Sequence, residues 1–219
     1  MEEIHNFFIL QNMTEEELKK IKEYSYKKRF KENEMIYIEG EKGDEIYWIL
    51  SGLFKVFTTS SKGRDKTLEI LGEGDFFGEM ALFDEAKRLT SVQAVAEGVL
   101  RIISRDKYKK MISEIPEIAL KTIGALSLRL QEANQEIKNL TFQTTDSRLK
   151  QTLQHLGKKF GEKKDKTTQI KQKFTHQELA DMVGTTRANV TKLLNNMQEE
   201  DLIDIRDRTI YLKDSFWSE

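Results

Sequence analysis

Residues 116–142, PEIALKTIGALSLRLQEANQEIKNLTF, form the stretch that decides how the chain is organised. Its apolar side chains recur at alternating spacings of three and four residues, at Ile123, Leu126, Leu130, Ala133, Ile137 and Leu140. A repeat of about 3.5 residues, held over about three heptads, keeps one narrow stripe of a helix facing a partner helix. An amphipathic helix lying on its own domain would show a wider apolar face. The pattern therefore predicts a dimerisation helix, with packing on its own domain as the alternative.

The region before this helix has the pattern of a β-rich domain. A capping box at Thr14 and Glu17 first predicts a short helix through Tyr24. Short runs of β-forming side chains then alternate with glycine-containing turns. The runs cover residues 35–38, 46–50, 53–57, 67–71, 91–95 and 99–103. Many short strands at near-regular spacing predict an antiparallel barrel or sandwich.

One segment, residues 74–88 with the sequence GDFFGEMALFDEAKR, interrupts the strand pattern. Gly78 followed by EMAL predicts a turn and then one turn of helix, whose free N–H groups face whatever precedes them. Such a helix start, together with Arg88, forms a candidate anion cradle built from backbone amides and a guanidinium. The alternative is a loop with a helix cap and a surface salt bridge, and the spacing alone leaves both open.

The chain after residue 143 predicts a helical domain. Asp146 is a candidate N-cap for a helix through Phe160, and the basic loop 161–166 leads to a short strand near Ile170. The next stretch, residues 174–194 with the sequence FTHQELADMVGTTRANVTKLL, carries the most specific pattern in the chain. Its signature positions are a capping box, a small residue at a helix crossing, a turn glycine and two apolar anchors: Thr175 with Glu178, Ala180, Gly184, Val190 and Leu193. This arrangement predicts a helix-turn-helix.

A helix-turn-helix places the start of its second helix in the major groove of DNA. Arg187 is suited to a bidentate contact with guanine, and Asn189 to adenine or phosphate. Residues 202–212 predict a hairpin, or wing, behind this helix. The predicted DNA-contacting residues are Thr175, Thr185, Thr186, Arg187, Ala188, Asn189, Lys192, Arg206 and Arg208.

The distribution of charge supports this interpretation of the C-terminal region. Residues 148–192 carry eleven Lys or Arg against four Asp or Glu, a balance of +7, whereas residues 193–219 carry three against seven. A charge run is often only a solvated surface, so it is weak support by itself. The alternative is a helical hairpin in an interaction domain that binds no DNA. The spacing of the motif, the basic balance and the wing favour DNA.

Composition excludes several classes of site. At 219 residues the chain is long enough for two domains of ordinary size. It has no cysteine, which excludes disulfides, thiolate-bound metals and cysteine-held iron–sulfur clusters, and its three histidines are far apart, so we expect no metal site and no haem. No apolar run approaches the roughly 18 residues of a membrane span. The first ten residues, MEEIHNFFIL, lack the basic start of a secretory signal, so a cytoplasmic location is expected.

Nearly the whole chain resembles one family, the CRP/FNR transcription regulators. The residues that carry the resemblance are the 39–44 segment EGEKGD with Gly52, the Gly78 segment with Arg88, Arg129 in the long helix, and the 175–193 motif. The resemblance implies an α+β fold: an antiparallel β-roll of the double-stranded β-helix or jelly-roll type, a long dimerisation helix and a C-terminal winged helix-turn-helix. It implies domains at residues 1–115, 116–143 and 144–219. It also implies RNA polymerase as a partner.

Family members that bind cyclic AMP contact it through the Gly78 segment and through the dimerisation helix, and the resemblance implies the same contacts here. Gly78, Glu79, Arg88 and Arg129 match residues that hold the ribose, the phosphate and the base. The full set of candidate effector-binding residues is Gly78, Glu79, Met80, Arg88, Leu89, Thr90, Arg129, Ala133 and Asn134.

Three positions depart from the pattern of the members that bind cyclic AMP. Leu89 stands where a phosphate-binding serine follows the arginine, with Thr90 one position later as the alternative donor. Ala133 and Asn134 stand where two hydroxyl residues contact the base. Each lost hydrogen bond to a charged group removes about 1.5 to 3 kcal/mol, so cyclic AMP is not expected to bind.

The sequence therefore predicts a homodimeric, sequence-specific DNA-binding regulator of the CRP/FNR type, an activator and not an enzyme. Its β-roll either senses an unidentified small molecule or holds the active state without one. The alternative is a regulatory subunit or scaffold that uses the same β-roll and binds no DNA.

Overall fold

A computed structural model describes residues 14–80 and 87–217 of the chain, which forms two compact units, Met1–Glu132 and Ala133–Glu219. The first unit is an antiparallel β-roll with helices, and the second is a winged helix-turn-helix. The fold class predicted from the sequence is thus confirmed. The boundary between the units falls inside the long helix, so the three-part division at residues 115 and 143 stays a prediction.

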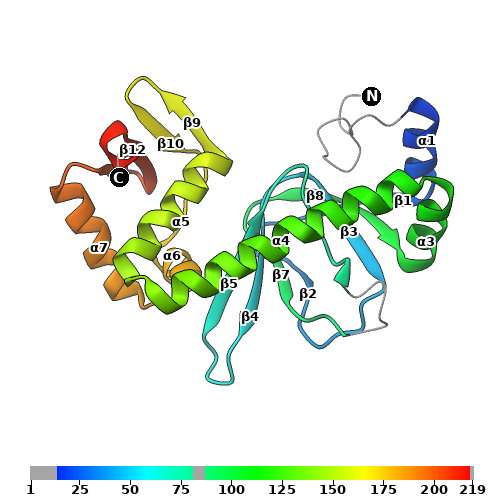
Figure 1. Ribbon diagram of the computed structural model, residues 1–219, viewed down its shortest axis with the longest axis horizontal. Helices are drawn as coiled ribbons and strands as arrows, with labels where there is room; N and C mark the ends of the chain where they lie inside the picture. The colour runs from blue at the N-terminus through cyan, green and yellow to red at the C-terminus, as the bar shows by residue number, and fades with distance from the viewer. Residues whose placement is uncertain (1–13, 81–86, 218–219) are drawn as a thin grey trace. The chain divides into compact units, whose positions relative to one another are not determined.

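The β-roll consists of two four-stranded antiparallel sheets (Figure 1). The first sheet has the order β1-β8-β3-β6, with bounds Ser25–Phe30, Gly98–Ser104, Glu45–Ser51 and Phe76–Phe77. The second has the order β2-β7-β4-β5, with bounds Met35–Tyr37, Ser91–Ala94, Phe54–Thr59 and Asp65–Leu71. Strands far apart in the sequence therefore lie side by side, as in the pairing of β3 with β8.

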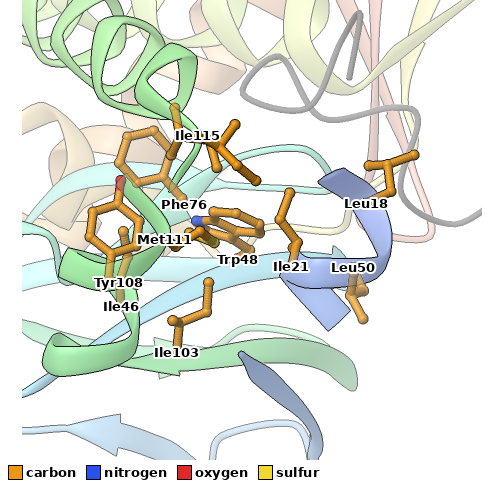
Figure 2. Close-up of a cluster of buried hydrophobic side chains, with 11 residues drawn as sticks. Leu18, Ile21, Ile46, Trp48, Leu50, Phe76, Ile103, Tyr108, Met111 and Ile115 are labelled. Carbon is orange, nitrogen blue, oxygen red and sulfur yellow. The ribbon is translucent and has the colours of Figure 1, made fainter. Parts of the chain in front are cut away.

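Two apolar clusters hold the first unit together. One contains Leu18 and Ile21 of α1 (Glu15–Glu23), Trp48 of β3 and Tyr108 of α3 (Arg105–Glu114), and its side chains surround the Trp48 indole in Figure 2. The other lies among the strands and includes Phe54. Because α1 and α3 each place apolar side chains in the first cluster, both helices are fixed on the roll.

The sequence predicted the six strands it named to within about two residues, but it missed others. β1, with the sequence SYKKRF, has four consecutive exposed residues and hence no apolar alternation to detect. β6 is only two residues long. α3 was not predicted because it buries only Tyr108 and Met111. The capping box of Thr14 with Glu17 is confirmed, and its helix ends at Glu23.

Helix α4, Pro116–Phe142, has the bounds predicted from its periodicity. Its first turns pack on the roll: Ile118 and Thr122 are buried, and the Thr122 hydroxyl lies 2.7 Å from the Tyr108 hydroxyl. Its predicted seam is not buried within the chain. Ile123, Leu130 and Ile137 are each more than 60% exposed.

After the last turns of α4, the second unit contains α5, Thr145–Phe160, followed by the hairpin of β9 (Gly161–Lys164) and β10 (Thr167–Ile170). The helix-turn-helix follows as α6 (His176–Val183) and α7 (Arg187–Glu199), and the wing as β11 (Ile203–Arg206) and β12 (Thr209–Lys213), with a final 3₁₀ turn at Asp214–Trp217. The strands of the hairpin and of the wing join in one sheet of order β11-β12-β10-β9. The predicted wing is confirmed, with Asp207 and Arg208 at its turn.

Three local predictions in this unit are wrong. The N-cap of α5 is Thr144, whose hydroxyl accepts a hydrogen bond from Ser147 N, while Asp146 lies in the first turn. The basic loop 161–166 contains strand β9. Leu193 is only partly buried, and the buried apolar residues of α7 are Val190, Leu194 and Met197.

Candidate functional site

The turn after β6 is packed so tightly that only glycine fits at its centre. Gly78 has φ +87°, a conformation that residues with side chains rarely adopt. A Cβ atom there would lie 2.9 Å from Nη1 of Arg88 and 2.9 Å from the carbonyl oxygen of Glu45. Gly78 thus allows Arg88 and β3 to approach the same turn. The rest of the predicted helical turn, residues 81–86, lies outside the described residues.

The Arg88 guanidinium is buried and hydrogen-bonded to the backbone. Its Nη1 donates to the carbonyl oxygen of Gly78 at 2.9 Å, and its Nη2 donates to the carbonyl oxygen of Glu45 at 2.9 Å. It also lies over the rings of Tyr37 and Tyr47, 4.2 and 5.5 Å from their centroids. These contacts brace the turn against β3. Of the guanidinium nitrogens, Nε is buried without a hydrogen-bond partner among the described residues.

The two tyrosines around Arg88 are neutral at physiological pH. Burial raises the pKa of Tyr37 to about 12, although the nearby Arg88 charge acts to lower it. Burial likewise raises the pKa of Tyr47, and the hydrogen bond that its hydroxyl donates to Glu45 raises it further. The charges in this region therefore come from the arginines and carboxylates.

Arg129 of α4 forms a second polar cluster with the same turn. Its Nη1 donates to Oε1 of Glu79 at 2.9 Å, and Nε lies 3.7 Å from Oε2 of Glu69 on β5. Its Nη2 donates to the carbonyl oxygen of Phe76, whose ring centroid lies 4.7 Å from the guanidinium. Burial lowers the pKa of Arg129, but attraction to Glu79 and Glu69 outweighs that effect and the pKa is raised. Arg129 therefore stays charged and ties α4 to the roll.

The structure thus brings together four of the predicted effector residues, as the pairs Gly78 with Arg88 and Glu79 with Arg129. The other five are placed differently. Met80 and Leu89 are about 60% exposed, and Thr90 is half-buried and hydrogen-bonded to the Tyr37 hydroxyl. Ala133 and Asn134 are exposed residues of α4 in the second unit.

Sequence reasoning missed Glu69, Glu45 and the two tyrosines as members of these clusters. Glu69 follows a bulge in β5: Val56 pairs with Glu69 but Phe57 pairs with Thr67, so Leu68 has no partner on β4. A bulge changes which side chain faces which side of a strand. Strand periodicity therefore offered no signal for Glu69.

The candidate DNA-reading surface is the start of α7. The capping box of Thr175 with Glu178 is present at the start of α6, and Gly184 closes that helix with a left-handed φ of +74°. Thr186 caps α7 by accepting a hydrogen bond from Asn189 N at 3.3 Å. Arg187 and Ala188 are exposed there, and Lys192 is exposed one turn later. This surface presents a guanidinium, a methyl group and an ammonium to solvent.

Contacts inside the motif fix two of the predicted reader residues. Nδ2 of Asn189 donates to the Thr185 hydroxyl at 3.0 Å, which leaves the Asn189 carbonyl oxygen and its second N–H for a ligand. The Thr175 hydroxyl donates to Glu178 at 2.8 Å, so it serves the cap of α6. Nδ1 of His176 lies 2.7 Å from the Thr191 hydroxyl and thereby couples α6 to α7.

Of the two arginines of the wing, Arg206 is fixed by contacts with other wing residues. Nε of Arg206 donates to Asp204 at 2.7 Å, and the guanidinium lies over the Tyr211 ring. Arg208 is exposed at the turn, where its φ is +63°. Arg208 is thus the more accessible cation of the wing.

Within residues 14–80 and 87–217, no three His, Cys, Asp or Glu side chains gather closely enough to hold a metal ion. None of the helices described there is both long and apolar enough to cross a membrane.

Comparison with known sequences matches both units to described families. Residues 27–114 match the cyclic nucleotide-binding domain, and residues 147–215 match the Crp-like helix-turn-helix domain. The chain is 32% identical over 132 residues to a CRP-like cAMP-activated global transcriptional regulator of Mycobacterium tuberculosis, covering 60% of this chain and 59% of the relative. It is 32% identical over 126 residues to the cyclic AMP receptor protein of Thermus thermophilus, with 58% of each covered. The chain thus spans about three fifths of the length of these curated relatives.

Solved structures show the same architecture over most of the chain. A transcriptional regulator of the CRP/FNR family from Thermus thermophilus superimposes with a TM-score of 0.73 at 28% identity, covering 86% of this chain and 94% of that one. The regulator CLP from Xanthomonas campestris superimposes with a TM-score of 0.81 at 24% identity, covering 91% and 99%. At 24% identity, the similarity to CLP shows a shared fold and nothing about function.

Proposed function

Since the chain belongs to the CRP/FNR family of transcription regulators, we propose that it is a homodimer that reads a two-fold symmetric DNA site through α7. One observation carries this proposal. Arg187, Ala188 and Lys192 are exposed at the start of a helix that is anchored by buried apolar residues on its other face. A recognition helix needs this combination, because the reading side chains must be free while the helix itself is fixed.

The exposed side chains at the start of α7 indicate which base pairs this helix recognises. Arg187 offers the fork of donors that matches O6 and N7 of guanine. Ala188 has no acceptor for a cytosine amino group, and its methyl group fits a thymine methyl. We propose a site that requires guanine opposite Arg187 and tolerates or prefers A·T at the next pair. Lys192, Arg206 and Arg208 contact phosphates in this account.

The dimer forms through the seam of α4. Ile123, Leu130 and Ile137 are 62%, 63% and 62% exposed in the single chain, and they lie on one stripe of the helix. Full burial of each such side chain stabilises an interface by about 1.5 to 3 kcal/mol. A parallel pairing of two α4 helices would cover all three, and it would give the protein two readers. With two readers, the half-sites lie about one helical turn, ~34 Å, apart on the DNA.

The proposed role is that of an activator in the cytoplasm that works with RNA polymerase and is not an enzyme. The support comes from the relatives, of which one is named a cAMP-activated global transcriptional regulator. No effector is assigned, but cyclic AMP is not proposed as one. The Leu89 side chain is exposed and apolar where a phosphate ligand would need a hydroxyl, and the Arg88 guanidinium already donates to two backbone carbonyls.

An electrophoretic shift with random genomic fragments tests the DNA-binding role. We expect a complex whose affinity falls steeply with added salt, because cationic side chains replace counterions on the phosphates. The rival account, a regulatory subunit or scaffold without DNA binding, predicts no salt-sensitive complex. The Arg187→Ala variant serves as the matched control, since it removes one exposed side chain and leaves the buried anchors of α7 unchanged.

A further inference from the structure

Two carboxylates lie within 4 Å of the Arg129 guanidinium. Glu79 is the carboxylate that the family resemblance assigns to ligand binding, and it lies 2.9 Å from Arg129. Glu69 on β5 adds a second carboxylate, 3.7 Å from Nε of the same guanidinium. No resemblance or motif assigned a role to Glu69. Its position depends on the bulge at Leu68, which sets the side of β5 from which Glu69 projects.

The charges around Arg129 do not favour an anion. Its guanidinium faces two carboxylates within 4 Å, those of Glu79 at 2.9 Å and Glu69 at 3.7 Å. One guanidinium against two carboxylates leaves a formal net charge of −1 around Arg129. A phosphate-bearing ligand would add a further negative charge to a region that is already negative. Like charges at short range in a partly buried site repel strongly.

The guanidinium groups are also engaged by the protein. Arg88 donates to the carbonyl oxygens of Gly78 and Glu45, and Arg129 donates to Glu79 and Phe76. Nε of Arg88 is buried without a hydrogen-bond partner among the described residues, and each Nη nitrogen of the two guanidinium groups carries a second N–H beyond the bonds named here. A phosphate group, which is best held by several donors at once, would have to compete with these contacts.

We propose that Glu69 is a specificity-determining residue of the effector site: together with Glu79 it neutralises Arg129 and so excludes ligands that carry a negatively charged phosphate. The inference rests on the proposed assignment of this site to effector binding. It commits the effector to a neutral or cationic small molecule. Removal of the Glu69 charge should therefore let anions in without changing the affinity for uncharged ligands.

The test uses two probes that share a base and a ribose. Cyclic AMP carries one negative charge and adenosine carries none. Repulsion by the Glu69 carboxylate therefore lowers the affinity for cyclic AMP alone. Both are titrated by calorimetry, up to millimolar concentration, into the full chain without DNA. The variant is Glu69→Gln, which keeps the shape of the side chain. Because Glu69 is partly exposed whereas Glu79 is sealed, with side-chain exposures of 29% and 4%, this change leaves no carboxylate buried without a cation.

Glu97→Gln is the matched control. Glu97 accepts from Arg29 at 2.9 Å in an exposed pair elsewhere on the roll, so the same change is made there without touching the Arg129 cluster. Far-UV circular dichroism and the midpoint of thermal unfolding check that each variant is folded.

We expect Glu69→Gln to bind cyclic AMP roughly tenfold or more tightly than the wild type, as one charge within a few ångströms implies, with adenosine unchanged. The double variant Glu69→Gln with Arg129→Gln should lose the gain, and Glu97→Gln should match the wild type. Equal cyclic AMP binding by wild type and Glu69→Gln, including undetectable binding by both, would overturn the proposal. A gain shared by adenosine would also overturn it, since opening of space rather than removal of charge would explain it. Because the titration contains no DNA, these outcomes are independent of whether α7 reads DNA.

Discussion

Nη1 of Arg129 donates a hydrogen bond at 2.9 Å to Oε1 of Glu79, and this contact ties helix α4 to the turn that follows β6. The two residues are 50 positions apart in the sequence. Glu79 is almost completely buried, so its charge depends on Arg129 for compensation. The same helix that carries the proposed dimer seam is therefore held to the roll by an ion pair.

Loss of Arg129 should destabilise the first unit. Arg129→Gln leaves the buried Glu79 carboxylate without its cation, and we expect the free energy of unfolding to fall by about 3 kcal/mol, the lower end for a broken buried pair because Arg129 is partly exposed. Denaturant titration followed by tryptophan emission measures this. A Trp217→Phe background makes Trp48, which lies in the core of the first unit, the only reporter.

The control for this measurement is Arg29→Gln. Arg29 pairs with Glu97 at the same 2.9 Å, but the two side chains are 73% and 61% exposed. Such a surface pair contributes about 0.2 to 1 kcal/mol at most. Equal losses in the free energy of unfolding from Arg29→Gln and Arg129→Gln would show that the buried pair of Arg129 with Glu79 stabilises the protein no more than the exposed pair does.

The seam prediction concerns Leu130, which is 63% exposed in the single chain and lies at the centre of the apolar stripe. Leu130→Lys would place an unpaired charge in the middle of the proposed helix pair, which costs several kcal/mol, so we expect monomers in sedimentation velocity. Gln131→Lys adds the same charge to the next residue, which lies outside the stripe, and should stay dimeric. A folded Leu130→Lys variant that sediments as a dimer would exclude this seam.

Alkaline pH should destabilise the first unit through its buried tyrosines. Burial raises the pKa of Tyr37 and of Tyr108, each to about 12, whereas in the unfolded chain both ionise near 10. The folded state therefore keeps protons that the unfolded state releases between about pH 10 and 12. The stability that these groups contribute is fully present below about pH 10 and is lost as the pH rises through 12.

This dependence is measured as the free energy of unfolding at several pH values from 9 to 12, again with Trp48 as the reporter. The Tyr108→Phe variant should show a shallower decline, by roughly 2 kcal/mol over this range, since one of the buried tyrosines no longer ionises. The comparison uses slopes, because the variant also loses the contact with the Thr122 hydroxyl at every pH. Identical slopes for variant and wild type would show that Tyr108 does not titrate in this way.

Lys192 should act on DNA affinity alone. It is exposed one turn after Arg187, where a phosphate contact is expected, so Lys192→Ala should weaken binding to all sequences alike. The slope of log affinity against log salt should fall by about one. Fluorescence anisotropy at several salt concentrations, with one cognate and one scrambled duplex, measures both effects. A loss confined to the cognate duplex would instead assign Lys192 to base reading.

The sequence predicted those elements whose signals are local. The capping boxes of Thr14 with Glu17 and Thr175 with Glu178 each need only a hydroxyl and a carboxylate three residues apart, and both are present. The periodicity of α4 gave its bounds. The predicted cap of α5, Asp146, was wrong: Thr144 caps the helix, and Asp146 lies in the first turn, where its negative charge interacts favourably with the positive end of the helix.

The ion-pair cluster could not be predicted from local patterns. Glu69 lies 3.7 Å from Arg129 and follows the bulge at Leu68, which shifts the pairing register of β5. Arg88 was predicted as an anion ligand from its spacing to Gly78, but its partners include the Glu45 carbonyl on a strand more than 40 residues earlier. Such contacts depend on how distant strands pair, and single-sequence reasoning has no access to that pairing.

Selection of binding sites from a random DNA pool, with wild type and Arg187→Ala in parallel, tests the central claim most directly. We predict that the wild type enriches a two-fold symmetric site with half-sites about one helical turn (~34 Å) apart, and that it requires guanine opposite Arg187. Arg187→Ala should bind the best site more weakly by roughly 1 to 3 kcal/mol and accept other bases at that position. An unchanged guanine preference in the Arg187→Ala pool, or enrichment of sites without symmetry, would contradict the account.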